Sequence, residues 1–531
     1  MIKVGPVPLD RFCARRSELQ RLDKIKNDFL NGYRRNLAIL GPLNIGKTSL
    51  VLKYIHHVMG RDIFPIYINL EDGFFTDNFL GSIFFFLHKF TNGEITDLSS
   101  VSETLKERFS YLKKFVDDLE EYYKRGDYTR LFHHILKLDK IIYRYLKLRC
   151  VYIIDEFFNL EKLRIGSWIK LLRENIMLNS SSLFILISSE VERAKSILHS
   201  EFSLLFGNFE ILELKKLSYT EAIEFIAHRK ITADRKILDN LIFLTAGYPL
   251  YLDILTDWIQ DNLKTLDREG LLVTIRENVL DNKGFLYRYF QEKLKYSLPY
   301  KENREYLWFL LEVAKGNIRR RELEEKLKPG LLNCSLNGHL EKSGSFYRLK
   351  DPLFRLWLLY AYQPDVMGLR FSHKEELNIF APGIEGMIPE IYNWDDNSHR
   401  TQIVKLLKNL LLAFNNEYVM VNDNRKIFPK FSKIIEENIF GDVLCLKCEK
   451  KKGRPWAVVI SFKVIDEPQA VELIKLLPKR DFSNRICIDF CKLDVSVTTI
   501  LKAGGFWIWD VEFLNYLLEL YISGYAVMGG N

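Results

Sequence analysis

The 531-residue chain lacks a long apolar run. A membrane-spanning helix needs about 20 consecutive apolar residues, and the apolar stretch at residues 79–87 is soon followed by His88 and Lys89. The first residues also lack the apolar core of a secretory signal peptide. We therefore expect a soluble, cytoplasmic protein that does not associate with a membrane.

Cysteine is scarce too, since the chain has seven scattered cysteines, an odd number. Secreted disulfide scaffolds carry dense, even sets, so we expect reduced thiols. Two close pairs, Cys445 with Cys448 and Cys487 with Cys491, raise the alternative of zinc. Both pairs fall on strand-like runs, where a spacing of three points two side chains to opposite faces. We therefore favour buried strand thiols over a zinc site.

Extremes of composition are absent as well. Apolar residues make up 47% and charged residues 27% of the chain, which excludes a largely disordered protein. The net charge of +8 is a small excess for this length, so it permits nucleic-acid binding without indicating it. A chain this long is expected to form about three or four domains.

Apolar strand-like runs alternate with amphipathic stretches in the first part of the chain, which predicts an α/β fold with a mostly parallel sheet. The candidate strands are residues 36–40, 64–70, 150–154, 183–187 and 210–214. Heptad-like apolar spacing predicts a helical insertion at residues 99–148. We divide the chain into an α/β core (1–215), a helical segment (216–295), a segment of short helices with one strand (296–364), a linker (365–395) and a smaller C-terminal α/β domain (396–531).

A complete G-x-x-x-x-G-K-[ST] motif lies between the first strand and a helix-like stretch. Its glycines let backbone N–H groups face phosphate oxygens, and the helix N-terminus adds to the attraction. Lys47 is expected to reach the β and γ phosphates of ATP, and Thr48 to offer its hydroxyl to Mg²⁺. The motif comprises Gly41, Pro42, Leu43, Asn44, Ile45, Gly46, Lys47 and Thr48, and Ser49 extends the expected nucleotide contact.

Two acids end the third strand, where a phosphate loop needs them. Asp155 is expected to hold Mg²⁺, and Glu156 to polarise the water that attacks the γ-phosphate. The next strand ends in Ser188 and Ser189, whose hydroxyls are candidates for sensing the phosphate or the water. A simple capping role for these serines is the alternative.

Several motifs in this order resemble archaeal ATPases of the STAND/AAA-like group. Residues 12–19 resemble the family's F-x-G-R-x-x-E-L box, with Ala14 in place of its glycine and Arg15 at its arginine. Residues 202–225 are similar to its LYGR stretch, and residues 245–252 to the G-x-P motif of its lid. The resemblance implies that the box straps across the base side of the nucleotide and that Pro249 touches the base. From the residues alone, without the resemblance, Gly247-Tyr248-Pro249 is interpreted as a kink or a helix junction.

One position departs from the family, because Asn208 stands where it has an arginine. If that arginine contacts phosphate in the relatives, hydrolysis here is weakened or needs an arginine from a neighbour. Arg193 is a candidate by position, although a solvated helix arginine is the plainer interpretation.

The pattern after residue 303 predicts a winged helix, with helices near 305–314, 320–327 and 331–342 and a strand at 346–349. Residues 347–357 resemble the Y-x-L-x-D-P-L-x-R-F-W signature that follows this module in the family. The third helix is poor in basic residues, while Arg319, Arg320 and Arg321 precede it. DNA contact and packing within the chain remain equal alternatives.

In the relatives the tail is a restriction-endonuclease-like domain, whose chemistry needs an aspartate and an E-x-K motif on neighbouring strands. Here Asp442 and Lys463 match, but Ser461 stands at the glutamate position. A serine is a poor metal ligand, so we expect an inactive nuclease fold. A turn at residues 450–454 is either a phosphate grip or a solvated hairpin.

These patterns predict a Mg²⁺-dependent ATPase in which the ATP or ADP state repositions the winged helix and the tail, acting on duplex DNA. One alternative is an ATP-dependent DNA endonuclease that cuts despite Ser461. Another is a nucleotide-gated scaffold that binds a protein partner, or its own copy, without DNA.

Overall fold

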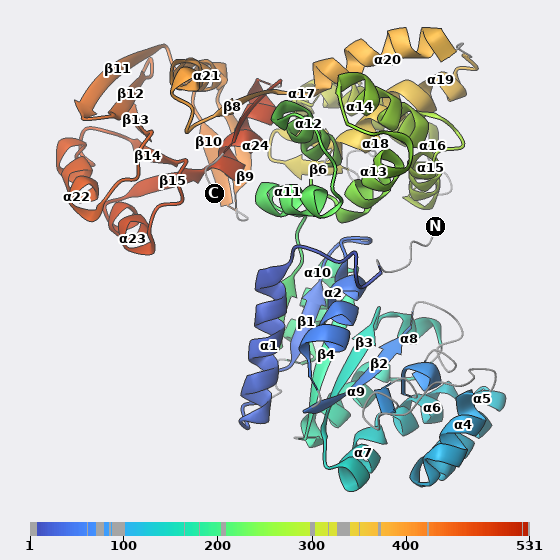
Figure 1. Cartoon of the computed structure of the whole chain (residues 1–531). Coiled ribbons are helices and arrows are strands. Elements are labelled where there is room, and N and C mark those ends of the chain that lie inside the picture. The colour runs from blue at the N-terminus through green and yellow to red at the C-terminus, as the bar shows by residue number, and fades with distance from the viewer. Residues whose placement is uncertain are drawn as a thin grey trace. The chain divides into compact units, whose positions relative to one another are not determined.

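The computed structural model describes residues 8–60, 62–70, 79–83, 86–87, 101–163, 165–179, 181–202, 209–297, 303–316, 318–326, 340–349, 351–369, 373–421, 424–522 and 524–528. None of the helices in these ranges is long and apolar enough to cross a membrane. The chain divides into two compact units (Figure 1). The first comprises residues 3–231 and 247–257, and the second comprises residues 232–246 and 258–531.

The first unit is built on a five-stranded parallel sheet, as predicted. Its strands are β1 (Leu37–Leu40), β2 (Ile63–Asn69), β3 (Arg149–Asp155), β4 (Ser182–Ser188) and β5 (Glu210–Glu213), in the order β2-β3-β4-β1-β5. Strand β4 separates the strand before the phosphate loop from the strand that ends in the acids. This order is that of an ASCE-type P-loop NTPase. Strands β1 and β4 are buried along their whole length, which explains their continuous apolar sequences.

Helices cover this sheet and extend its core (Figure 1). Between β2 and β3 lie α4 (Val101–Arg108), α5 (Lys113–Lys124), α6 (Tyr128–Ile135) and α7 (Leu138–Leu146). Leu105, Phe115 and Leu119 of this segment are buried in the same apolar cluster as the sheet. The other helices are α1 (Arg16–Leu30), α2 (Lys47–Lys53), continued by a π-helical turn (Tyr54–Val58), α8 (Asn159–Lys162), α9 (Trp168–Leu178), α10 (Val191–Ser200) and α11 (Tyr219–His228).

The second unit begins with helices. Within the expected winged helix, the bounds of the third helix (331–342) need correction. Residues 327–339 lie outside the described ranges, but residues 340–342 belong to β6 (Leu340–Ser343), not to a third helix. Strand β6 pairs with β7 (Phe346–Leu349) across the turn at Gly344. The helices are α12 (Arg235–Thr245), α13 (Pro249–Asn262, which starts in the first unit), α14 (Arg268–Ile275), continued by a π-helical turn (Arg276–Leu280), α15 (Phe285–Ser297), α16 (Asn303–Ala314), α17 (Arg320–Lys326), α18 (Pro352–Trp357), continued by a π-helical turn (Leu358–Tyr362), and α19 (Gln363–Val366).

The segment expected to be a loose linker is largely ordered into elements. It contains α20 (His373–Met387), with Pro382 inside the helix, and β8 (Glu390–Asn393). Phe380 and Ile384 are buried, so tertiary packing holds the helix despite its proline. Strand β8 pairs with β16 (Tyr525–Met528) in parallel, near the end of the chain.

The C-terminal part contains a second five-stranded sheet, β11 (Lys433–Phe440), β12 (Val443–Glu449), β13 (Trp456–Ser461), β14 (Asn484–Asp489) and β15 (Phe506–Asp510), in that order. Neighbours β11, β12 and β13 are antiparallel, whereas β13, β14 and β15 are parallel. Apolar residues of α21 (Arg400–Ala413) and α24 (Val511–Tyr521) share one buried cluster with the sheet. Those of α22 (Glu467–Leu476) and α23 (Val495–Ala503) share another. Cys448 belongs to the first cluster and Cys445 to the second, so the two thiols point to opposite faces as expected.

The β6–β7 hairpin is built into the tail. Ser345 N donates to Tyr418 O (2.9 Å), and Ser345 Oγ accepts from Tyr418 N (3.2 Å). Tyr418 lies on β9 (Glu417–Val421), which pairs with β10 (Asn424–Phe428). Phe346 is fully buried in the apolar cluster of α21 and α24. The hairpin and the tail therefore share one hydrophobic core.

Candidate functional site

The phosphate loop connects β1 to α2 in the conformation that its glycines allow. A Cβ at Gly41 would lie 2.8 Å from Leu214 O, so only glycine fits between the loop and the segment after β5. Gly46 (φ 94°) precedes α2 in a left-handed conformation, and Asn44 (φ 61°) adopts the same region. The backbone therefore turns sharply before the helix N-terminus.

Lys47 is buried beneath this loop and bonds to its backbone. Its Nζ donates to Gly41 O (3.0 Å), Pro42 O (3.1 Å) and Ser189 Oγ (2.9 Å). Glu156 Oε1 lies 3.6 Å away. These partners place the ammonium at the centre of the site, between the loop and the ends of β3 and β4.

Asp155 meets the loop from the end of β3. Its Oδ2 accepts hydrogen bonds from Thr48 Oγ1 (2.7 Å) and from Tyr67 OH (3.1 Å). Its Oδ1 is buried with no hydrogen-bond partner among the described residues. Burial raises the pKa of Asp155 to about 6, an effect that the Thr48 bond opposes and the Glu156 charge reinforces. A buried carboxylate oxygen without a partner, beside a hydroxyl, fits a Mg²⁺ ligand set.

Glu156 sits just past the strand in a strained backbone conformation (φ 49°). Its Oε2 accepts from Ser189 N (3.0 Å), and Ser189 Oγ donates to its Oε1. Ser189 thus bridges Glu156 and Lys47. Ser188 behaves differently, because its Oγ accepts from Glu190 N (3.0 Å) at the start of α10, which is the capping alternative.

The box that contains Arg15 lies against the phosphate loop. The buried guanidinium of Arg15 donates to Ile45 O of the loop (3.4 Å) and to Lys215 O after β5. Its Nη1 also lies 3.0 Å from Glu18 Oε1. Ala14, at the position of the family glycine, is buried with φ 62°, a conformation that glycine adopts readily. The box therefore connects the loop to the chain after β5.

The Gly247-Tyr248-Pro249 segment packs on the chain that leads out of the sheet. Gly247 O accepts from Leu217 N (2.9 Å), and a Cβ on Gly247 would lie 2.3 Å from Leu217 O. The Tyr248 ring contacts the core cluster and the Lys216 ammonium, 4.5 Å from its centroid. Pro249 opens α13, so the motif is a helix junction.

Two further positions concern an arginine that could contact phosphate. Asn208 lies outside the described residues. Arg193 is half exposed on α10 and pairs with Glu161 (2.5 Å) and Glu190 (3.1 Å), with its guanidinium over the Phe158 ring. It is therefore a surface arginine held by local partners in this conformation.

Tyr67 is the site residue that the motifs did not indicate. It lies on β2, next to β3, where the register aligns Asn69 with Asp155. The spacing of a tyrosine two positions before the end of a neighbouring strand is the signal, but it becomes visible only once the strand order is known.

The expected nuclease-like residues also come together, in the second unit. Lys463 Nζ lies 2.5 Å from Asp442 Oδ2, and this lysine lowers the pKa of Asp442. Ser461 Oγ donates to Lys463 O (2.7 Å) and so caps the turn after β13.

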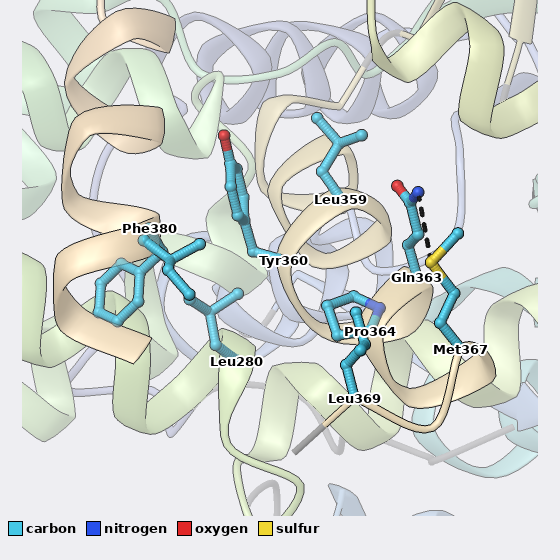
Figure 2. Close-up of a pocket in the computed structure, with 9 residues that line it drawn as sticks. Leu280, Leu359, Tyr360, Gln363, Pro364, Met367, Leu369 and Phe380 are labelled. Atoms are coloured by element: carbon cyan, nitrogen blue, oxygen red, sulfur yellow. Dashed lines mark hydrogen bonds between the residues drawn. The ribbon is translucent and has the colours of Figure 1, made fainter. Parts of the chain in front are cut away.

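The second unit also contains an apolar cavity of about 240 Å³ (Figure 2). One wall is the chain of residues 359–369, which includes α19, and another is α20. Its polar side chains are Tyr360 and Gln363, and Gln363 Nε2 lies 4.0 Å from Met367 Sδ. Among the described residues, no charged side chain lines it. The lining residues are Leu280, Leu359, Tyr360, Gln363, Pro364, Met367, Leu369, Ile379 and Phe380.

Neither the protein-family models nor the curated proteins compared with this sequence include a match. Solved structures with a similar shape include a Walker-type ATPase of Pyrococcus abyssi, with 17% identity over 67% of this chain and 99% of that chain and a TM-score of 0.45. The ORC2 protein of Aeropyrum pernix, in ADPNP–ADP complexes, has 15% identity over 67% and 94% with a TM-score of 0.34. The Holliday junction branch migration motor RuvB of Thermotoga maritima has 13% identity over 69% and 100% with a TM-score of 0.33. At these values the fold assignment rests on the chain's own strand order and phosphate loop.

Proposed function

We propose that this chain is an ATP-binding and ATP-hydrolysing switch of the STAND/AAA-like type. The observation that carries the proposal is the convergence of Lys47, Thr48, Asp155, Glu156 and Ser189 at the carboxyl edge of β1, β3 and β4. A phosphate loop, a buried acid beside its threonine and a second acid one residue later are the parts that phosphoryl transfer needs.

Nucleotide binding replaces contacts that the site makes with itself. The β and γ phosphates take the place of Gly41 O and Pro42 O as partners of the Lys47 ammonium, because charged oxygens are stronger acceptors. Thr48 and Asp155 are the residues that would hold Mg²⁺, which neutralises phosphate charge when it is bound. The unpartnered Oδ1 of Asp155 supports this assignment.

Glu156 is the proposed general base, and Ser189 is its positioning residue. The two hydrogen bonds from Ser189 hold the carboxylate beside Lys47. When phosphate binds the Lys47 ammonium, Glu156 loses its cation partner. Its carboxylate is then available to accept a proton from water. Ser189 thus couples the occupancy of the loop to the position of the base.

The route for the switch runs through backbone contacts of the first unit. Arg15 joins the loop at Ile45 to the chain at Lys215, two residues before Leu217, which holds Gly247. A shift of the loop on phosphate binding therefore reaches the start of α13. This path supports the proposed lid role of Pro249 and the coupling to the winged-helix and nuclease-like segments, which we propose act on duplex DNA.

Removal of the loop lysine tests the proposal. We expect Lys47→Ala to weaken ATP binding at least 100-fold in isothermal titration calorimetry, since the central charge partner of the phosphates is lost. Lys170→Ala, an exposed lysine on α9 in the same unit, is the control and should bind ATP as the wild type does. Unchanged affinity in Lys47→Ala would refute the site.

The pairing of Asp442 with Lys463 keeps a nuclease as the second candidate function. Ser461 supplies no carboxylate, so we propose that cleavage is absent. Mg²⁺-dependent cutting of plasmid DNA that disappears in Asp442→Ala would establish the endonuclease instead.

A further inference from the structure

The two ends of the C-terminal sheet carry different sets of charged side chains. At one end Asp489 and Asp510 close β14 and β15, and Asp442 precedes β12. At the other end the β12–β13 turn, residues 450–454, lies beside the turn before β14, residues 478–483. We call these two segments the basic turns, because they contain Lys450, Lys451, Lys452, Arg454, Lys479 and Arg480.

Hydrogen bonds fix the basic turns to each other. Arg454 Nη1 donates to Lys479 O (3.3 Å) and to Arg480 O (2.9 Å). Ser483 Oγ accepts from Lys450 Nζ (2.9 Å) and donates to Arg454 O (2.9 Å). The backbone that carries these cations is therefore fixed before a ligand binds. This preorganisation lowers the conformational entropy that the turns lose on binding.

The charges in the basic turns are poorly neutralised. Among the described residues, no carboxylate lies within 4.0 Å of Lys451, Lys452 or Lys479, while Arg480 is 3.7 Å from Asp481. Burial and the neighbouring Arg454 lower the pKa of Lys450, as expected where cations crowd together. A surface of this kind attracts a polyanion.

The arginines next to the β6–β7 hairpin present a contrast. Arg319 pairs with Glu417 (2.9 Å) and Glu322 (3.7 Å), and Arg321 pairs with Glu325 (3.6 Å). The tip of the hairpin is occupied by Tyr418. Carboxylates therefore already pair with Arg319 and Arg321, and the tail already contacts the tip of the hairpin.

The chemistry of the basic turns favours a duplex over a single strand. Single-strand binders stack bases on exposed aromatic rings. Among the described residues of 396–528, Tyr525 is the one aromatic residue classed as exposed, and it lies on β16. Phe482, within the basic turns, is partly buried against the cluster of α22 and α23. Contacts to the regular phosphate backbone of a duplex need cations alone.

We propose that the basic turns bind the phosphate backbone of duplex DNA, independently of base sequence, at the end of the sheet opposite Asp442 and Lys463. The inference rests on the DNA partner in the proposed function but not on ATP hydrolysis. It places the DNA contact of the tail at the opposite end of the sheet from the nuclease-like residues.

Charge removal in the full-length chain tests this surface. The variant combines Lys451→Ala, Lys452→Ala, Lys479→Ala and Arg480→Ala, and it keeps Arg454 and Lys450, whose bonds hold the turns. We expect duplex DNA affinity in fluorescence anisotropy to fall at least tenfold at about 100 mM salt. The slope of log K against log salt should fall by roughly 2 to 4, because each lost phosphate contact contributes about 0.9.

The control variant combines Arg321→Ala with Lys405→Ala, two exposed cations elsewhere in the second unit, and should bind DNA within twofold of the wild type. An unchanged unfolding temperature verifies that both variants fold. Equal affinity of the four-residue variant and the wild type, a loss confined to the Arg321 variant, or no wild-type binding at low salt would each overturn the proposal. Absent ATP turnover with charge-dependent DNA binding would refute the proposed ATPase and leave this surface standing.

Discussion

Ala14 holds a backbone conformation that costs an L-residue free energy. Its φ of 62° lies in the left-handed region, and Arg15 follows with φ 61° so that its guanidinium reaches the phosphate loop. Side chains pay about 1 kcal/mol or more in this region, whereas glycine does not. The strain at Ala14 is therefore tolerated because it places Arg15.

We expect Ala14→Gly to stabilise the chain by up to about 1 kcal/mol, since relief of strain outweighs the lost methyl contact. Ala227→Gly, at an exposed position in the last turn of α11, should instead destabilise it by up to about 1 kcal/mol. Calorimetric unfolding measures both. Destabilisation of the same size in the two variants would contradict the strain at Ala14.

Asp155 carries a cost that depends on pH. Because burial raises its pKa to about 6, the folded chain binds a proton there more tightly than the unfolded chain does. The ionised carboxylate therefore destabilises the nucleotide-free fold in full above about pH 6, and the penalty fades as the pH falls toward 4.

We expect Asp155→Asn to raise the unfolding temperature of nucleotide-free protein at pH 8 and to raise it little near pH 4.5. The shift in pKa corresponds to up to about 3 kcal/mol. Glu192→Gln, exposed on α10, is the control and should be neutral at both pH values. A stabilisation that does not change with pH would argue against a charged, buried Asp155.

At the scale of elements, the β6–β7 hairpin is the feature with the clearest consequence. Gly344 turns the hairpin with φ 60°, and a Cβ there would lie 2.3 Å from Tyr418 O. The hairpin is thus locked against β9, and removal of the tail would expose Phe346 to water. Truncation at residue 395 is therefore a poor test of the tail's function, and point variants are preferable.

We expect Gly344→Ala to destabilise the second unit by at least about 3 kcal/mol, from backbone strain and the clash with β9. Gly368→Ala has a similar φ of 69° and no atom within 4 Å of the added Cβ, so it should cost only about 1 kcal/mol. Limited proteolysis and calorimetry report the difference. Equal losses would mean that the hairpin does not depend on its contact with β9.

Burial decides which of these elements can be predicted from the sequence. Strands β1 to β4 were predictable because their burial produces continuous apolar runs between longer amphipathic segments. Strand β10 gave no such signal, since four of its five residues are exposed. Helix α20 was hidden by Pro382 and Gly383, whose cost is offset by packing that no local pattern reports.

The site divides in the same way. Lys47, Thr48, Asp155 and Glu156 follow from local motifs, because loop and strand-end chemistry is written in consecutive residues. The bridge from Ser189 to Glu156 and the bond from Tyr67 depend on strand order, which is a property of the whole sheet.

On the scale of the whole molecule, the chain joins a P-loop NTPase fold to a second unit whose helices, hairpin and C-terminal sheet share buried cores. The chain passes between the two units near residues 231, 246 and 257. These crossings lie close in sequence to Leu217 and Gly247, the positions reached by the contacts of Arg15. We propose that ATP hydrolysis at the nucleotide site drives this switch.

Steady-state and single-turnover ATP hydrolysis by Glu156→Gln, with binding measured in parallel, tests that claim most directly. The amide keeps the shape of the side chain but is no base, so we predict ATP affinity within about threefold of the wild type and turnover reduced at least 100-fold. Wild-type turnover in Glu156→Gln would contradict the proposed role of Glu156 as the general base.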